Sequence, residues 1–238
     1  MTKRRKEVVS GTDRSRDVAD FLKKVAAAPR LGPAGARGRL LFAMDATASR
    51  EASWDMACQI QGDMFAETST LGGLDVQLVY YRGFREFRAS PWVSSSADLI
   101  PFMTRVRCLG GHTQIERVLR YAARENAKSK ISALVFVGDC LEEEVDRVCD
   151  AAGALGLQGV PCFMFHEGAD MRAASAYRQI ARLTNGAFCA FDASSARQLR
   201  ELLSAVAVFA AGGHRALSDY SQGKQGPVLQ IAHQLGRG

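Results

Sequence analysis

The 238-residue chain lacks the sequence motifs of several common functional classes. Its six cysteines are scattered without any C-x-x-C pair, which argues against a zinc ribbon or a dithiol redox centre. It contains no G-x-x-x-x-G-K-[ST] phosphate loop, no G-x-G-x-x-G dinucleotide motif and no G-x-S-x-G nucleophile elbow. The common nucleotide-binding and serine-hydrolase classes are therefore not indicated.

The sequence also lacks long hydrophobic runs. No uninterrupted apolar stretch approaches the roughly 20 residues with which a helix crosses a bilayer. No apolar segment follows the basic N-terminus, as one does in a secretory signal peptide. Several cysteines lie in apolar runs such as Pro161-Cys-Phe-Met-Phe165, where a thiol packs as a small hydrophobic group. We therefore expect a cytoplasmic protein whose cysteines stay reduced.

The charge is present but unevenly distributed. The net charge is +6, and residues 1–38 contain ten Lys/Arg against four Asp/Glu, whereas residues 212–238 contain three against one. The central part of the chain is therefore slightly acidic. We interpret the basic start, Met1-Thr-Lys-Arg-Arg-Lys6, as a solvated tail. The less favoured alternative is that residues 1–14 contact nucleic acid, an anionic membrane or an acidic partner.

From Arg39 onward, apolar strand-like runs alternate with segments of helical periodicity. Runs that are apolar throughout are typical of parallel strands covered on both faces, and their alternation with helices indicates βαβ crossovers. The sequence therefore predicts a doubly wound α/β fold with a mostly parallel sheet. The predicted strands are Leu40–Met44, Val76–Tyr81, Ala133–Val137, Val160–Phe165 and Ala187–Phe191, with Phe84–Arg88 as a short antiparallel edge strand.

Three regions are expected along the chain. Residues 1–38 form the basic arm, in which Val18, Phe21, Leu22 and Val25 predict a short amphipathic helix that packs on the body. Pro29 ends that helix, and the Gly/Pro/Ala-rich residues 31–38 form a linker. Residues 39–211 form the α/β domain. Gly212-Gly213 ends the last helix, and residues 212–238 form a tail with one further small helix near residues 228–235.

Five oxygen-bearing residues fall where predicted elements change direction. The run Leu40-Leu-Phe-Ala-Met-Asp-Ala-Thr-Ala-Ser49 ends a buried strand with Asp45, Thr47 and Ser49 at alternate positions, whose side chains can share one side. Thr113 follows Gly110-Gly111, and Asp139 ends another buried strand. Ligands of open α/β sheets collect at the carboxyl ends of strands, and donor sets made of oxygen favour Mg²⁺, Mn²⁺ or Ca²⁺. The pattern predicts a divalent-metal site.

Helix capping is the competing interpretation of the first three residues. Thr47 and Ser49 could cap a helix that begins near Arg50, and Asp45 could accept backbone N–H bonds. The position of Thr113 and Asp139 favours the metal site over this alternative.

These residues resemble the von Willebrand factor A (VWA) domain with its metal-ion-dependent adhesion site, whose pattern is D-x-S-x-S, a distant Thr and a distant Asp. Asp45, Thr47, Ser49, Thr113 and Asp139 match this pattern in order, and the resemblance covers about residues 39–210. It implies that the three hydroxyls coordinate Mg²⁺, or Mn²⁺ or Ca²⁺, directly and that the aspartates act mainly through waters. A vacant coordination position would then accept a carboxylate from a partner protein.

The chain departs from the family pattern at two positions. Thr47 replaces the commoner Ser but keeps the hydroxyl. Arg50 stands where the family often has Met, and a cation there either weakens metal binding or steers acidic ligands to the site.

The favoured function is a metal-dependent protein-binding module that is not an enzyme. One alternative is a metal-dependent hydrolase that uses the same oxygens, with His112 or His166 as base, although neither histidine has ligand spacing. We assign both histidines to ordinary loop hydrogen bonds, and Glu142-Glu-Glu144 to the first turn of a following helix, where the helix dipole favours acidic residues. A second alternative is a scaffold whose basic arm contacts nucleic acid.

Overall fold

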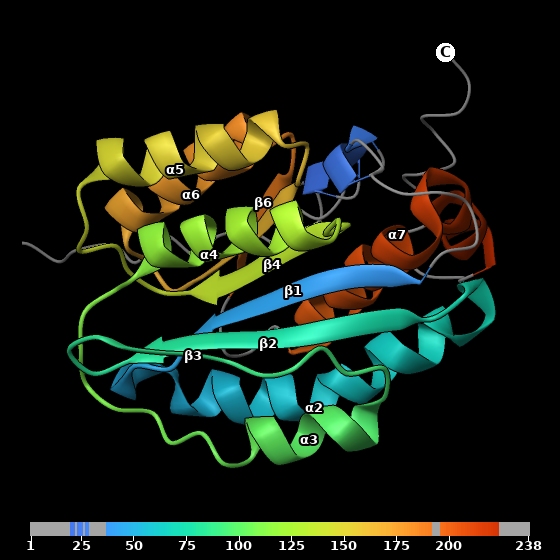
Figure 1. Ribbon diagram of the computed structural model, residues 1–238, viewed down its shortest axis with the longest axis horizontal. Coiled ribbons are helices and arrows are strands. Elements are labelled where there is room, and N and C mark those ends of the chain that lie inside the picture. The colour runs from blue at the N-terminus through green and yellow to red at the C-terminus, as the bar shows by residue number, and fades with distance from the viewer. Residues whose placement is uncertain (1–19, 22, 26, 29–36, 192–195, 224–238) are drawn as a thin grey trace, which may run out of the picture.

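In the computed structural model, the described residues are 20, 21, 23–25, 27, 28, 37–191 and 196–223. They form a six-stranded sheet between two layers of helices (Figure 1). The strand order is β3-β2-β1-β4-β5-β6, and all neighbours are parallel except β2 and β3. The strands are β1 Gly38–Asp45, β2 Leu74–Arg82, β3 Glu86–Ala89, β4 Ala133–Gly138, β5 Cys162–Glu167 and β6 Ala187–Phe191.

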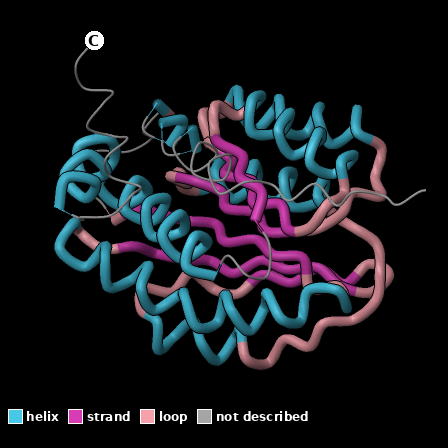
Figure 2. Tube along the Cα trace, turned by 180° about the vertical axis from the view of Figure 1, so that it is seen from behind, coloured by secondary structure: helices cyan, strands magenta, loops and turns pink. Residues whose placement is uncertain are grey.

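Helices cover both faces of the sheet. α2, α3 and α7 lie on one face, and α4, α5 and α6 lie on the other, as the views from the front and from behind show (Figures 1 and 2). A 3₁₀ turn, η1, precedes α2, and a second one, η2, follows it. The bounds are η1 Ala48–Arg50, α2 Glu51–Thr68, η2 Ser69–Leu71, α3 Ser96–Met103, α4 Ile115–Lys128, α5 Val145–Leu157, α6 Met171–Leu183 and α7 Ala196–Gly223.

The apolar pattern of β1 explains why it lies inside the sheet. Successive side chains of a strand point to opposite faces. Leu40, Phe42 and Met44 accordingly pack into the core under α2 and α7, whereas Leu41 and Ala43 pack into the core under α4, α5 and α6. A strand that feeds two cores has to be apolar at every position, and β4 is likewise buried along its whole length. The predicted fold class is confirmed.

The antiparallel edge strand is confirmed as well, with a shifted start. β3 pairs with β2 from Arg82↔Glu86 to Val79↔Ala89, two residues later than the predicted start at Phe84. Phe84 lies in the connecting turn and is 78% exposed. The hairpin between β2 and β3 needs connecting residues, and Phe84 is one of them although its side chain is large and apolar.

The N-terminal helix packs on the body through Phe21, whose ring lies 5.2 Å from the ring of Phe165 and 6.0 Å from that of Phe163. Val25 belongs to the same core. Val18, Leu22, the basic residues 1–14, most of the linker and the helix expected near residues 228–235 lie outside the described residues.

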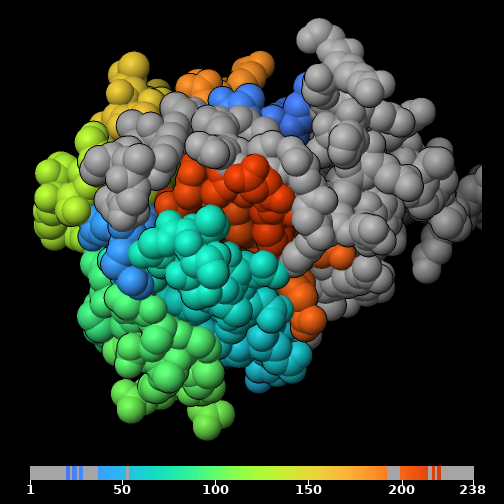
Figure 3. All heavy atoms as spheres, turned by 90° about the vertical axis from the view of Figure 1, so that its right-hand side faces the viewer, coloured from blue at the N-terminus to red at the C-terminus, as the bar shows by residue number. Residues whose placement is uncertain are grey.

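At the other end of the domain, the helix break predicted at Gly212-Gly213 is present inside α7. Gly213 has a φ of 70°, which breaks the helix, but a second helical segment continues to Gly223. Leu217 of that segment is buried in the core, so the packed body extends beyond residue 211. Figure 3 shows this end of the molecule, where α7 lies beside the segment that joins α2 to β2. No helix among the described residues has the length and apolarity to cross a membrane.

The topology places the winding reversal of the sheet at the carboxyl ends of β1 and β4. β1 pairs with β2 on one side and with β4 on the other, so the chain changes its winding direction between these two central strands. Such a reversal leaves the crossover connections on opposite faces, and ligands of open α/β sheets bind beyond the strand ends at this point. Asp45 ends β1 and Asp139 directly follows β4, so both lie at this position.

Candidate metal centre

Asp45 is the last residue of β1, and its side chain is buried. The backbone N–H of Thr47 donates to its Oδ1 atom at 2.7 Å. Its Oδ2 atom is buried and has no hydrogen-bond partner. Burial is the main cause that raises the pKa of Asp45 to about 6, and the hydrogen bond from Thr47 partly offsets it. The strand thus ends in a carboxylate that lacks part of its solvation.

Thr47 and Ser49 direct their hydroxyls along the same rim. Thr47 Oγ1 lies 3.4 Å from Ser49 Oγ, and Ser49 Oγ donates to Asp139 Oδ2 at 2.5 Å. Neither hydroxyl acts as the helix cap that the competing interpretation required. Thr47 precedes η1 and Arg50 precedes α2, and neither side chain makes a capping hydrogen bond. Only the N–H bond to Asp45 agrees with that interpretation.

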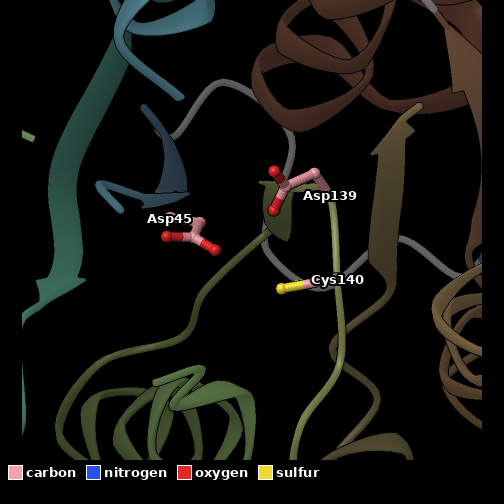
Figure 4. A group of neighbouring side chains, drawn as sticks. All are labelled: Asp45, Asp139 and Cys140. Carbon is pink, nitrogen blue, oxygen red and sulfur yellow. The ribbon is translucent and has the colours of Figure 1, made fainter. Parts of the chain in front are cut away.

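Asp139 follows β4, and its Oδ1 atom is the second buried carboxylate oxygen without a partner. Ligand atoms of Asp45, Asp139 and Cys140 all lie within 4.8 Å of one another. Figure 4 shows the three side chains directed into one space, Asp45 from the end of β1 and Asp139 and Cys140 from the loop that follows β4. Sequence reasoning missed Cys140. Its only signal was the position directly after Asp139, and adjacent residues of an extended chain would point apart.

Two hydrogen bonds hold the backbone of this loop. His166 Nε2 lies 3.1 Å from the carbonyl oxygen of Asp139, and Tyr177 donates its hydroxyl to the carbonyl of Cys140 at 2.9 Å. A carbonyl only accepts, so Nε2 carries the proton. Burial lowers the pKa of His166, which favours the neutral ring. His166 therefore makes the ordinary hydrogen bond expected of it, and together with Tyr177 it fixes the chain next to Asp139.

Thr113 is tied to the same loop through Glu142. The backbone N–H of Glu142 donates to Thr113 Oγ1, and the N–H of Thr113 donates to Glu142 Oε2, both at 3.0 Å. Thr113 is buried, and His112 beside it is exposed and also contacts Glu142, at 3.1 Å. The hydrogen bonds thus place Thr113 against the segment that follows Asp139 rather than against Asp139 itself.

Gly111 allows a close approach between two backbone segments. A Cβ atom there would clash with the carbonyl group of Gly83, whereas one at Gly110 would meet nothing within 4 Å. The missing side chain lets the loop before Thr113 pack on the turn between β2 and β3, where His112 N–H also donates to Gly83 O. The glycine therefore positions the loop and does not open space for a cation.

The acidic run Glu142-Glu-Glu144 does not form the first turn of the helix that follows it, so that prediction was wrong. α5 begins only at Val145. The carboxylate of Glu143 instead accepts from the backbone N–H groups of Ile115 at 2.6 Å and Glu116 at 2.9 Å, and so caps α4 from a neighbouring loop. Burial raises the pKa of Glu143, and these bonds oppose that effect. Gln114, which precedes α4, makes no side-chain cap of its own.

Arg50 is almost completely buried and pairs with Glu167 at the end of β5. Its Nε and Nη2 atoms make no hydrogen bond. The guanidinium is therefore turned inward and does not face solvent, where it could steer an acidic partner. Its positive charge lowers the pKa of Asp45, a smaller effect than the burial of that carboxyl.

The residues present suit a divalent cation. Buried carboxylate oxygens are costly when nothing solvates them, and Asp45 Oδ2 and Asp139 Oδ1 are both in that state. Two hydroxyls adjoin them, and one of these is already within hydrogen-bonding distance of Asp139. A cation coordinated here, directly or through water, would satisfy both orphaned oxygens and would relieve the repulsion between the carboxylates.

Comparisons with known proteins agree with this architecture. Searches with protein-family profiles and against curated proteins find no match to the sequence. Solved structures do match. A von Willebrand factor type A protein from Catenulispora acidiphila superposes with a TM-score of 0.58 at 19% identity, over 73% of this chain and 43% of that one. The VWA domain of SpRpn10 gives 0.54 at 13% identity, over 71% and 93% of the two chains.

A third similar structure is proximal thread matrix protein 1 from the mussel byssus, with a zinc-occupied MIDAS motif. Its TM-score is 0.53 at 15% identity, over 75% of this chain and 48% of that one. The chain spans less than half the length of this protein and of the Catenulispora protein. At these identities the comparisons establish a shared fold, that of the VWA domains, and leave the site to be judged from its own residues.

Proposed function

We propose that this chain, which has the fold of the von Willebrand factor type A domains, is a metal-dependent protein-interaction module. Asp45, Thr47, Ser49, Thr113 and Asp139 would hold a Mg²⁺-type ion, with Mn²⁺ or Ca²⁺ as alternatives. The ion would use its open coordination position to bind an Asp or Glu side chain of a partner protein.

The pair of orphaned oxygens, Asp45 Oδ2 and Asp139 Oδ1, is the observation that carries the proposal. Structural carboxylates inside proteins normally accept hydrogen bonds or pair with a cation. Here both oxygens come from adjacent strands, and Arg50, the nearby buried cation, pairs with Glu167 instead. The byssus protein, whose MIDAS motif is occupied by zinc, further supports a divalent ion at such a site.

Hydrogen bonds within the chain would hold the metal-binding residues in position. Thr47 N–H holds one oxygen of Asp45 and leaves the other available. The anchors from His166 and Tyr177 fix the backbone on the opposite side. Since the supporting hydrogen bonds already exist, little conformational entropy would be lost when an ion binds.

The surface beside the site suits a protein partner. Leu109 is 48% exposed, and its N–H donates to the carbonyl of Ala46 between Asp45 and Thr47. Phe84 is 78% exposed, and its ring packs edge-on against His112. Large apolar side chains at a rim favour protein contacts over small hydrophilic ligands. We propose a cytoplasmic location on the ground that all six cysteines, which lie in the described part of the chain, are free.

Thermal unfolding tests the site. Millimolar Mg²⁺ or Mn²⁺ should raise the melting temperature of the wild type, because a ligand that binds only the native state stabilises it. Asp45→Ala and Asp139→Ala should abolish the rise. Asp146→Asn, which changes an exposed carboxylate on α5, should keep it. A rise that survives both alanine substitutions would place the ion elsewhere.

Affinity capture tests the partner. Bound proteins should be released by a chelator and should be missing with Asp45→Ala as bait, while Asp146→Asn recovers them. Excess free acetate should weaken capture, since it competes for the same coordination position. Turnover of phosphoesters or peptides that disappears in Asp139→Ala would instead support the hydrolase alternative.

A further inference from the structure

The thiol of Cys140 adjoins the two aspartates, although the all-oxygen adhesion site described above does not require it. Its sulfur lies within 4.8 Å of a carboxylate oxygen of each aspartate. It is free and half-buried, and Figure 4 shows it facing Asp45 from below Asp139. We propose that Cys140 is a metal ligand that lets this centre bind a thiophilic divalent ion, Zn²⁺ above all, more tightly than Mg²⁺. This inference rests on the proposed metal site.

The geometry suits a shared ion. Three atoms that are at most 4.8 Å apart all lie within about 2.8 Å of a common point, whereas zinc bonds sulfur at about 2.3 Å and carboxylate oxygen at about 2.0 to 2.2 Å. Inward movement of less than about 1 Å, which side-chain rotation supplies, would complete three bonds. A hydroxyl of the rim or a water would provide the fourth, since zinc favours four ligands.

A second observation separates Cys140 from an ordinary free thiol. Asp45 is fully buried, and its unpartnered Oδ2 belongs to the same carboxylate that faces the sulfur. The backbone of Cys140 is also fixed, because Tyr177 donates to its carbonyl. The remaining cysteines of the described chain show no such grouping with carboxylates.

The chemistry of the donors sets the preference. Thiolate selects Zn²⁺ or Co²⁺, whereas Mg²⁺ takes oxygen ligands and resists losing its waters. On binding, the metal–sulfur bond forms, the S–H bond breaks, and the proton passes to water or buffer. No electrons are transferred. The same loop would then serve Mg²⁺ through oxygen ligands alone and Zn²⁺ through two carboxylates and a thiolate.

Cobalt substitution is the direct test. Co²⁺ added to the wild type should give a near-ultraviolet sulfur-to-cobalt charge-transfer band, which only a bound thiolate produces. Cys140→Ser should remove the band. Cys149→Ser on α5 and Cys108→Ser in the loop before Thr113 should keep it. Cys140→Ser should also weaken Zn²⁺ binding about tenfold or more while leaving the Mg²⁺-dependent rise in melting temperature.

A measurement on the wild-type protein tests the same proposal without any substitution, in case Cys140→Ser fails to fold. Alkylation of Cys140, followed by mass spectrometry of its peptide, should be slower in Zn²⁺ than in the same concentration of Mg²⁺, because a bound thiolate is not available as a nucleophile. A Mg²⁺-dependent rise without a cobalt band, or a band that persists in Cys140→Ser, would overturn the role of Cys140 alone. Absence of stabilisation by any divalent ion would overturn the metal site as well.

Discussion

The hydroxyl of Ser49 donates a hydrogen bond to Oδ2 of Asp139 across 2.5 Å, although 90 positions separate the two residues. The bond joins the turn after β1 to the loop after β4, across the boundary between the two central strands. It also shows that the hydroxyl and the carboxylate approach the same point without help from an ion. A cation at that point would replace the proton of Ser49 as the positive partner of Asp139.

Replacing the hydroxyl of Thr47 should affect metal binding and not folding. Thr47→Val keeps the shape and removes a hydroxyl whose described hydrogen bond is long, at 3.4 Å. Without metal, we expect the free energy of unfolding to change by less than about 1 kcal/mol. With Mg²⁺, the affinity should fall on the order of tenfold. Thr47→Ser, which retains the hydroxyl, is the control. Equal Mg²⁺ affinity in the Val and Ser variants would exclude Thr47 as a ligand.

The metal-free protein should lose stability as the pH rises through the titration of Asp45. Its pKa in the folded state is raised from 3.8 to about 6. The folded state then binds the proton more tightly, so the contribution is full below the unfolded pKa and is lost as the pH rises through the folded one. Relative to Asp45→Asn, the free energy of unfolding should fall by about 2 kcal/mol between about pH 4 and pH 7.

Urea unfolding in the presence of a chelator measures this difference. The Asn variant removes the titrating group and keeps its size, so the titration of other groups cancels in the comparison. Wild-type and variant curves that run parallel over this range would contradict a raised pKa at Asp45.

Removal of the Glu143 carboxylate should destabilise α4 rather than α5. Glu143→Ala leaves the N–H groups of Ile115 and Glu116 without their partner, and we expect a loss of about 2 kcal/mol in the free energy of unfolding. Glu144→Ala is the matched control, because Glu144 is exposed and makes no capping bond to α5, and it should cost less than about 0.5 kcal/mol. Hydrogen exchange should speed up at the first turn of α4 only in Glu143→Ala.

Adjacent glycines should differ sharply in their tolerance of a methyl group. Gly111→Ala places Cβ against the carbonyl of Gly83, so the loop must shift, and we expect a cost of about 1 to 3 kcal/mol. Gly110→Ala meets open space and should be nearly neutral. Since Thr113 follows two residues later, the Mg²⁺-dependent rise in melting temperature should also shrink in Gly111→Ala. Similar stability in both variants would mean that the loop does not need this close contact.

Local patterns predicted the architecture well, because the burial of a strand depends on its own residues. Leu40–Met44 of β1 and the whole of β4 are apolar and buried, and the structure places both strands at the centre of the sheet with helices on each face. The predicted strands also placed Asp45 and Asp139 at strand ends, and the structure has Asp45 at the end of β1 and Asp139 directly after β4. The break in α7 at Gly213 was predicted too, but the second helical segment was not, because its Leu217 is held by tertiary packing in the core.

The partners of the loop residues could not be predicted in the same way. The pairing of Arg50 with Glu167 spans 117 positions, and the cap that Glu143 gives to α4 spans 28. Such contacts depend on how far each loop extends beyond its strand and on which way it turns. Glu143 is an example: its position in the sequence suggested the first turn of α5, but its carboxylate caps α4.

The sequence by itself determined the α/β fold, the central strands and the residues with which those strands end, because hydrophobic periodicity is a property of short segments. Only the tertiary structure decided that Cys140 turns toward Asp45, that Arg50 is buried with Glu167 and that Ser49 meets Asp139. These relationships arise from the docking of loops on adjacent strands, where distance in space is unrelated to distance along the chain.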